Sequence, residues 1–454
     1  MTRALPRRLL LGAAAGLVFG GYGGGSFQVA HGEPLGQASR AATKPCPPGP
    51  LQHFFESLQQ LSAGSRKQHV RVLWLGDSHT NADFLSGAVR SALAERFGDG
   101  GPGFVRIGTR PYRHDGLKVV RDGSWNVDPD PPARRALQGD GVFGLAGTRA
   151  VPLGGSSFSV APSEAQGTVT LARFEVSYQL PTGSSFELRL GPRRQLVDAK
   201  TAPELTASGI SHVSLFAPSN SHLLILPRAG APRLFGLTIE REGSAGFVLD
   251  TAGIDGARIE TALAWNEGSF VAEVARRAPD LAVIAYGTNE SFDKLRVAKY
   301  EAHLAALVSR VRAGAPGASC LVLGPTDAPL GQGSVPRVAE VGQALGKAAA
   351  RLGCSFVSLQ QLMGGEGSFA RDMKAKPRLA QLDRLHLTPK GYQVLGAALA
   401  KLLLDAYSAG RADVTLAPPP LATAAPSLAP GGAGTLPALA PAGAVPVTPA
   451  VHAE

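Results

Sequence analysis

An apolar run that ends in Gly-Asp-Ser at residues 76–78 constrains the fold of this chain more than any other feature. Residues 70–75 have the composition of a buried parallel strand, and residues 84–97 carry apolar side chains at helical spacing. Ser78 therefore lies where a strand ends and a helix begins, which is the edge of an open α/β sheet where ligands bind. A backbone N–H near a helix N-terminus also favours a developing negative charge. The alternative is that Asp77 and Ser78 only cap the helix.

Two later stretches carry further polar residues of the kind that catalysis needs. Residues 286–290 (Tyr-Gly-Thr-Asn-Glu) directly follow a second apolar strand, and residues 383–389 (Asp-Arg-Leu-His-Leu-Thr-Pro) lie close to the end of the last folded segment. A serine nucleophile needs a neighbouring base, and an aspartate can hold a histidine base in the required tautomer. We therefore assign Ser78 as nucleophile, His386 as base and Asp383 as the orienting group. The alternative is that Asp383 caps a helix and His386 is a surface residue.

Apolar strands alternate with helical patterns along most of the chain. Five strands are predicted, at residues 70–75, 246–250, 281–285, 320–324 and 354–359. Helical patterns separate them, and a closing helix at 389–407 begins with a proline in a favourable position. This alternation predicts an α/β fold with a three-layer, doubly wound parallel sheet of flavodoxin-like order.

Residues 106–244 interrupt this alternation. The segment contains short β-prone runs separated by Gly, Pro and Ser, and residues 186–190 (Phe-Glu-Leu-Arg-Leu) alternate cleanly between apolar and polar. Regular short strands of this kind predict an antiparallel β-sandwich, and the length is ordinary for one domain. We expect an inserted domain here.

The two ends of the chain differ in composition from the middle. Basic residues, including Arg7 and Arg8, precede an apolar run at 9–19, which is typical of a secretory signal and leaves twin-arginine export open. A membrane anchor is the weaker alternative because the run is short and rich in glycine. After Asp413 the Ala- and Pro-rich composition predicts a flexible tail. The predicted organisation is a signal at 1–33, a linker at 34–50, an α/β domain at 51–105 and 245–410, the insert at 106–244, and a disordered tail at 411–454.

The formal net charge of +10 favours an anionic partner. Export and the lack of basic runs interleaved with aromatic residues argue against nucleic acid, so an anionic envelope polymer or a membrane surface fits better. The alternative is that the charge only keeps the protein soluble.

The chain has three cysteines, Cys46, Cys320 and Cys354, and the last two each begin a predicted strand. They are interpreted either as buried thiols or as one disulfide, without a catalytic role. The cysteines have no metal-ligand spacing and the histidines form no cluster, so we expect no metal.

Three motifs taken together, Gly-Asp-Ser at 76–78, Gly-x-Asn-Glu at 287–290 and Asp-x-x-His at 383–386, resemble those of the SGNH (GDSL-like) hydrolase superfamily. The resemblance implies a triad of Ser78, His386 and Asp383. It also implies an oxyanion hole made of the Ser78 N–H, a glycine N–H and the Asn289 side chain. Within residues 253–256 we choose Gly256 for this role and keep Gly253 as second choice. The alternative is that these residues only form turns.

The sequence departs from the commonest superfamily pattern at two places: His79 follows Ser78 instead of leucine, and Glu290 follows Asn289 instead of aspartate. Neither change removes a catalytic group. Together with the Gly-Asp-Gly-Gly-Pro-Gly-Phe run at 98–104 and the β insert, they resemble the peptidoglycan O-acetylesterases, in which a carbohydrate-binding-like β-domain interrupts the SGNH fold. The resemblance covers residues 70–407.

The resemblance implies an exported serine esterase, located in the periplasm or outside the cell, that removes O-acetyl groups from a cell-envelope polysaccharide through an acyl-enzyme. O-acetylated peptidoglycan is the expected substrate, and no cofactor, nucleic acid or stable membrane insertion after processing is expected. Three alternatives remain open. They are an O-acetyltransferase with the same triad, a secreted acetylxylan or lipid esterase, and an inactive glycan-binding module.

Overall fold

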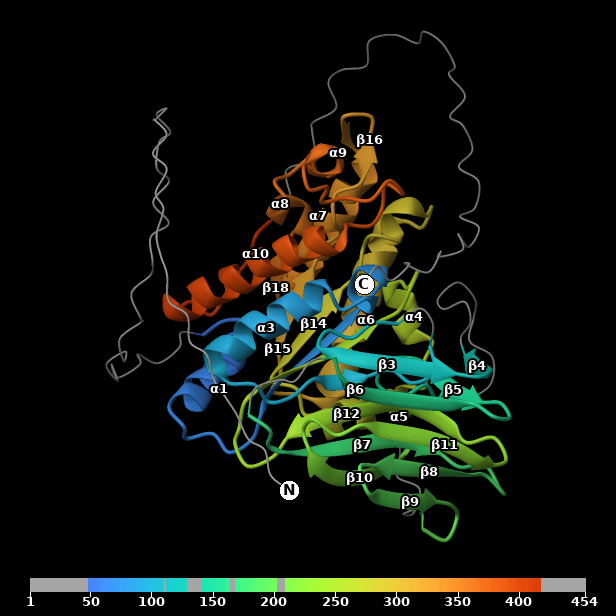
Figure 1. The fold of residues 1–454 in the computed structure, drawn as a ribbon. Helices are drawn as coiled ribbons and strands as arrows, with labels where there is room; N and C mark the ends of the chain where they lie inside the picture. The colour runs from blue at the N-terminus through green and yellow to red at the C-terminus, as the bar shows by residue number, and fades with distance from the viewer. Residues whose placement is uncertain (1–47, 110–111, 129–139, 164–167, 202–208, 418–454) are drawn as a thin grey trace, which may run out of the picture. The chain divides into compact units, whose positions relative to one another are not determined.

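A computed structural model describes residues 48–109, 112–128, 140–163, 168–201 and 209–417 (Figure 1). The predicted signal at 1–33, most of the linker at 34–50, Cys46 and residues 418–454 of the predicted tail lie outside the described residues. The sequence analysis also assigns residues 411–417 to the disordered tail, but they pack on the α/β part: Ala412 and Val414 are buried, and Leu416 forms a β-bridge with Val357. Within the described part of the chain, no helix combines the length and apolar character that crossing a membrane requires.

A five-stranded parallel sheet forms the centre of the α/β part. Its spatial order is β13 (Phe247–Gly253), β1 (Val70–Gly76), β14 (Leu281–Ala285), β15 (Ser319–Leu323) and β18 (Ser355–Val357). Counted along the chain, this order is 2-1-3-4-5, the flavodoxin-like order that the alternation of strands and helices predicts. All residues of these strands except Arg71 are buried, as expected for strands covered on both faces.

Helices cover both faces of this sheet (Figure 1). Val72 and Trp74 of β1 belong to the apolar cluster on one face, while Leu73 and Leu75 belong to the cluster on the other. The first cluster includes α1 (Gln52–Ser62), α3 (Leu85–Phe97) and α10 (Pro389–Ser408). The second includes α4 (Ile259–Leu263), α5 (Glu267–Arg277), α6 (Val297–Gly314) and α7 (Pro336–Arg351). Because successive side chains of a strand point to opposite faces of the sheet, the apolar run of β1 contributes to both hydrophobic clusters.

Shorter elements lie near the ends of the parallel strands. They are α2 (Ser78–Asn81), the 3₁₀ turn η1 (Glu290–Phe292), the hairpin of β16 (Pro329–Leu330) and β17 (Gly333–Ser334), α8 (Leu359–Leu362) and α9 (Ser368–Lys374).

The insert consists of two antiparallel sheets. One has the order β10 (Ser211–Pro218), β7 (Leu171–Gln179), β12 (Arg233–Arg241), β5 (Arg149–Pro152) and β4 (Trp125–Asp128), with β2 (Gly103–Val105) also paired to β12. The other has the order β3 (Leu117–Asp122), β6 (Ser157–Pro162), β11 (Leu223–Ala229), β8 (Ser185–Leu190) and β9 (Arg193–Val197). Apolar side chains from both sheets form one hydrophobic cluster. The sequence analysis places the start of the insert at residue 106, but the pairing of β2 with β12 already begins at Gly103.

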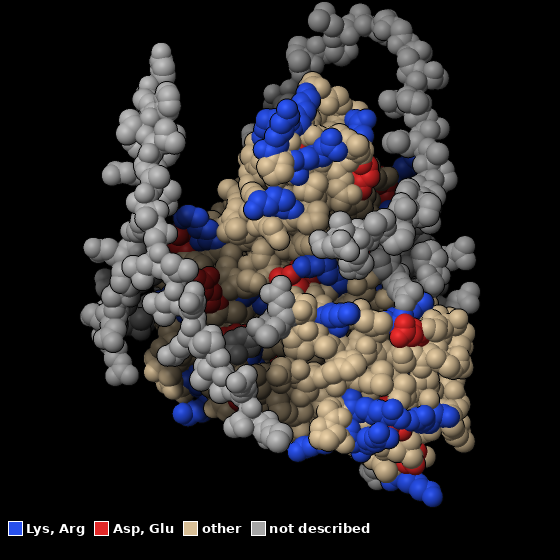
Figure 2. Space-filling view, viewed as in Figure 1, with Lys and Arg blue, Asp and Glu red and all other residues tan. Residues whose placement is uncertain are grey.

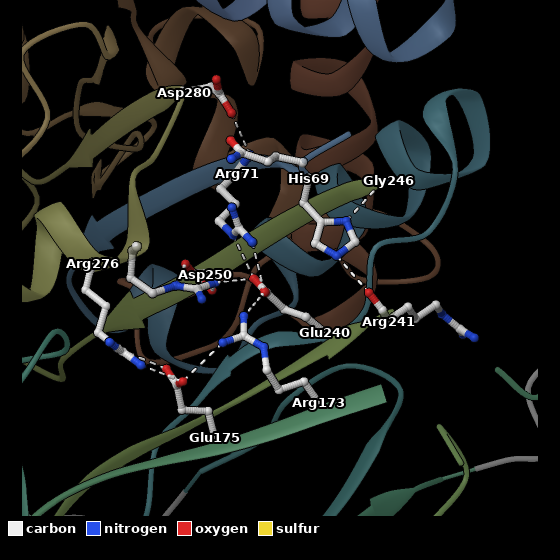
Figure 3. A network of polar contacts seen from close by, with 12 residues as sticks. His69, Arg71, Arg173, Glu175, Glu240, Arg241, Gly246, Asp250, Arg276 and Asp280 are labelled. Atoms are coloured by element: carbon white, nitrogen blue, oxygen red, sulfur yellow. Dashed lines mark hydrogen bonds and ion pairs between the residues drawn. The ribbon is translucent and has the colours of Figure 1, made fainter. Parts of the chain in front are cut away.

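A buried ionic network joins the insert to the α/β part (Figure 3). Glu240 of β12 is 1% exposed and binds Arg71 of β1, Arg173 of β7 and Arg277 of α5 at 2.7–3.0 Å. Arg277 also forms two hydrogen bonds to Asp250 of β13. Burial favours the protonated form of Glu240, but the guanidinium groups outweigh it and hold the pKa of Glu240 well below its usual range. A single buried carboxylate therefore connects β12 to three other elements of the molecule.

Cys320 and Cys354 form a disulfide. Cys320 is the second residue of β15 and Cys354 immediately precedes β18, and these strands are neighbours in the sheet. Of the two interpretations that the sequence left open, the structure shows the bridge.

Candidate active site

Ser78 lies at the carboxyl end of β1, at the first residue of the one-turn helix α2. Asp77 caps this turn: its side chain accepts a hydrogen bond from the His79 N–H at 3.0 Å. Gly76 allows the turn to fold back closely, because a Cβ there would lie 2.2 Å from the Thr80 hydroxyl oxygen. Both expectations from the sequence are therefore compatible, since Asp77 caps the helix while the Ser78 hydroxyl stays available.

The structure brings Ser78 and the distant His386 into contact. The Ser78 hydroxyl and His386 Nε2 are 2.8 Å apart, and His386 Nδ1 is 2.7 Å from Asp383 Oδ2. The other oxygen of Asp383 accepts the backbone N–H groups of Leu385 and His386, each at 3.0 Å. The carboxylate thus shapes its own loop and orients the imidazole at the same time, which is the arrangement that a serine nucleophile requires.

The electrostatics of this chain of contacts favour a charged imidazole. Burial opposes protonation of His386, but the hydrogen bond and charge of Asp383 outweigh it and raise the pKa of His386 above its ordinary value. Burial likewise acts to raise the pKa of Asp383, but its hydrogen bonds to His386 and Leu385 lower that pKa to about 2. Asp383 is therefore ionised at neutral pH, and its charge favours the protonated form of His386.

Hydrogen-bond donors surround the loop that contains Gly256. Within the described part of the chain, the N–H groups of Ser78 and Gly256 donate to no protein acceptor. Gly256 has a φ of 71°, a conformation that glycine adopts readily. The Asn289 amide donates to the Ala257 carbonyl at 2.9 Å, which uses one of its two hydrogens. Gly253, the second choice, has a packing role: a Cβ there would lie 2.4 Å from the Asn81 nitrogen.

Three residues that the sequence analysis did not identify hold this loop in place. Arg106 follows β2, is 3% exposed, and donates from Nη1 to Asn81 Oδ1 at 2.5 Å and to the Gly253 carbonyl at 2.7 Å. Asn81 donates in turn to Asp255 Oδ1 at 2.9 Å. The segment that leads into the insert thus contacts both the turn after Ser78 and the loop of Gly256. No motif marks Arg106, because its partners are 25 and 147 residues away.

The two departures from the superfamily pattern have structural explanations. His79 is buried, its Nδ1 lies 2.9 Å from the Tyr392 hydroxyl, and its ring centroid lies 5.3 Å from that of His386. Burial, together with the charge of His386, lowers the pKa of His79 to about 3, so this imidazole stays neutral. Glu290 accepts the N–H groups of Ile259 and Gly287 at 2.9 and 3.0 Å, and burial raises its pKa to about 7. A longer acid at this position therefore connects two loops of the site.

Comparison with known proteins defines the class. Residues 226–394 match the model of the GDSL-like lipase/acylhydrolase family, a stretch that contains Asn289, Asp383 and His386 but not Ser78. The match covers less than half of the chain; together with the parallel sheet, it supports a hydrolytic esterase with the SGNH fold.

The chain resembles a solved structure over most of its length. A peptidoglycan O-acetylesterase is 24% identical in sequence, with a TM-score of 0.66 over 79% of this chain and 96% of that chain. This likeness is one of fold. An acetylxylan esterase from Geobacillus stearothermophilus is 21% identical over 34% of this chain and 72% of that chain, with a TM-score of 0.28, which is too low to add to the assignment. No curated protein sequence matches the chain.

Proposed function

We propose that this protein is an exported serine esterase that hydrolyses O-acetyl groups on a cell-envelope polysaccharide, with O-acetylated peptidoglycan as substrate. The observation that carries the proposal is the pair of contacts that joins Ser78 Oγ to His386 Nε2 at 2.8 Å and His386 Nδ1 to Asp383 Oδ2 at 2.7 Å. These three side chains come from two ends of the α/β part and contact each other in the order that acyl transfer needs.

In the first half of the proposed reaction, the Ser78 oxygen attacks the acetyl carbonyl carbon while His386 Nε2 takes the hydroxyl proton. The negative charge that develops on the carbonyl oxygen is stabilised by the N–H groups of Ser78 and Gly256 and by the free hydrogen of the Asn289 amide. The bond to the sugar oxygen then breaks, and His386 returns its proton to that oxygen. The products are a free sugar hydroxyl and an acetyl ester on Ser78.

In the second half, a water molecule replaces the sugar. His386 takes a proton from the water, whose oxygen attacks the acetyl carbonyl carbon, and the same three donors stabilise the oxyanion. The bond to Ser78 breaks, the serine recovers its proton from His386, and acetate leaves. Apart from the ester and one water molecule, the groups that act in these steps are side chains and backbone N–H groups of this chain.

The choice of substrate rests on analogy and on the predicted export. The fold likeness to a peptidoglycan O-acetylesterase extends across the insert, since it covers 79% of this chain. We propose that residues 106–244 form a β-sandwich that holds the glycan, and that the predicted signal delivers the protein to the envelope where such a polymer is found. Fold alone does not define a substrate, so this step needs a direct test.

The decisive experiment measures acetate released from O-acetylated peptidoglycan, with acetylated xylan in parallel, by the wild type, Ser78→Ala and Ser65→Ala. Ser65 is an exposed serine whose hydroxyl donates to the Gln60 carbonyl, so its replacement is a matched control. We expect release from peptidoglycan by the wild type and Ser65→Ala, and none by Ser78→Ala. Release from xylan alone would keep the mechanism and reject the substrate. Equal activity of Ser78→Ala would reject the triad, and transfer of acetyl to an acceptor glycan instead of water would identify a transferase.

A further inference from the structure

Exposed cations gather on one side of the α/β part. Figure 2 shows Lys and Arg side chains over the region where Figure 1 places α9 and β16. Six basic residues between positions 371 and 390 are exposed, against two acidic residues in the same stretch. We call these six the basic face: Arg371, Lys374, Lys376, Arg378, Arg384 and Lys390.

The described residues do not neutralise the cations of the basic face. In the part of the chain that the structure describes, the contacts of Arg371, Arg378 and Arg384 are to backbone carbonyls, and Lys374 contacts the Gln332 amide oxygen. None of the six forms an ion pair with a described carboxylate. The insert differs, because one carboxylate there, Glu187, binds both of its arginine neighbours. An uncompensated cluster of this kind maintains a positive potential at the surface.

The basic face is continuous with the loop that carries Asp383 and His386. Arg384 lies between Asp383 and His386, has a φ of 64°, and donates to the Pro329 carbonyl of the β16 hairpin at 3.3 Å. On the other side of the loop, the Thr388 hydroxyl donates to the Arg378 carbonyl at 2.9 Å. A ligand held by these cations therefore lies beside the loop that positions His386.

We propose that the basic face binds the repeated carboxylates of an anionic glycan polymer and so retains the chain whose acetyl ester enters the site. This inference rests on the proposed function and names a property of its substrate. An acetyl ester is neutral, so the triad itself needs no such cations. Each exposed ion pair contributes little, but several along one polymer act together, and salt weakens them.

The inference fits a polymer better than a lipid surface, because the positive charge shares a loop with the catalytic groups. A protein that only docked on a membrane would gain nothing from cations next to Asp383 and His386. Anionic vesicles nevertheless provide the comparison that separates the two cases.

The test reverses the charges of two lysines of the basic face and changes no residue from Asp383 to His386. Neither Lys376 nor Lys390 forms a side-chain hydrogen bond or ion pair with another described residue, and Lys390 lies in the first turn of α10, where a glutamate is compatible with the helix dipole. The variant is K376E/K390E, and K67E/K347E is the matched control. Both of its lysines are exposed and lie outside the insert and the basic face, Lys67 just before β1 and Lys347 on α7, the helix that precedes β18. Unchanged thermal unfolding will show that both variants are folded.

The readout is the ratio of kcat/KM on O-acetylated peptidoglycan to kcat/KM on 4-nitrophenyl acetate. We expect this ratio to fall about tenfold in K376E/K390E at low ionic strength, to recover toward the wild-type value at high salt, and to stay constant in K67E/K347E. An unchanged ratio in K376E/K390E, or an equal fall in the control, would overturn the inference while leaving the proposed function intact.

Sedimentation separates failure of the inference from failure of the proposed function. If the wild type hydrolyses nitrophenyl acetate but releases no acetate from peptidoglycan, the proposed function fails. Co-sedimentation with de-O-acetylated peptidoglycan then still tests the basic face: weaker binding by K376E/K390E supports it, and equal binding overturns it. Loss of binding to phosphatidylglycerol vesicles, with peptidoglycan binding unchanged, would assign the face to a membrane and overturn the inference.

Discussion

Replacing Asp383 by asparagine removes one function of this side chain and keeps the other. In the structure, Oδ1 accepts the N–H groups of Leu385 and His386, while Oδ2 lies 2.7 Å from His386 Nδ1. An asparagine retains the acceptor that shapes the loop but places an N–H opposite Nδ1. The imidazole must then accept at Nδ1 and carry its proton on Nε2, which is the wrong tautomer for taking a proton from Ser78.

The expected loss in kcat for Asp383→Asn is about 10²–10³-fold, within the range that a positioned general base contributes. We place the loss at the low end because the Asp383 side chain is 43% exposed, so water replaces part of its effect. The pH dependence of kcat/KM is also expected to change. Because His386 must be neutral to act as base, kcat/KM rises with pH through its pKa, which Asp383 raises in the wild type. Without that carboxylate, the acid limb moves to lower pH while the plateau falls.

The assay is the hydrolysis of 4-nitrophenyl acetate as a function of pH, with Asp372→Asn as the matched control. That variant removes a nearby carboxylate that has no hydrogen bond to His386. It is expected to retain kcat within about threefold, the range of context-dependent effects on such groups. A plateau for Asp383→Asn that stays within threefold of the wild type, or an acid limb that does not move, would refute the assignment of Asp383 as the orienting group.

Three further predictions concern other parts of the molecule. Asn289→Ala is expected to lower kcat by about 10²–10³-fold with little change in KM, because it removes one oxyanion donor; an unchanged kcat would exclude Asn289 from the hole. Asp83→Asn leaves the buried Arg90 guanidinium without its counter-charge and should lower the free energy of unfolding in urea by about 3–5 kcal/mol, whereas a loss below about 1 kcal/mol would contradict the pairing. Replacing Cys320 and Cys354 by serine opens a loop with a separation of 34 residues, for which chain entropy gives a loss of about 4 kcal/mol; an unchanged urea midpoint would contradict this estimate.

The parallel sheet could be predicted from local sequence because its strands carry their own signal. Strands covered on both faces are almost wholly apolar, and the run from residue 70 to 75 shows this without knowledge of its neighbours. The strand order then follows from the alternation with helices, because right-handed crossovers leave few alternatives. For the insert, the sequence predicts an antiparallel sandwich of short strands but not which strands pair, since pairing depends on contacts between distant segments. The pairing of β2 with β12 is an example, with no local signal at residues 103–105.

The positions of Ser78, Asp383 and His386 could also be identified from sequence, because each lies in a short motif whose order along the chain is informative. Their contact could not, because Ser78 and His386 are 308 residues apart and meet only when α2 and the loop before α10 pack at one edge of the sheet. The role of Gly256 stays a prediction, although its unpaired N–H agrees with it.

The sequence alone therefore determines which segments are strands and helices and which residue types are available for chemistry, because both depend on neighbours within about one turn or one strand. Only the tertiary structure decides what holds the site. Arg106 reaches Asn81 and Gly253 from the start of the insert, and Glu240 gathers three arginines from three elements. A buried charge must be satisfied by whatever the fold brings within hydrogen-bond distance, and that choice is not written in any local pattern.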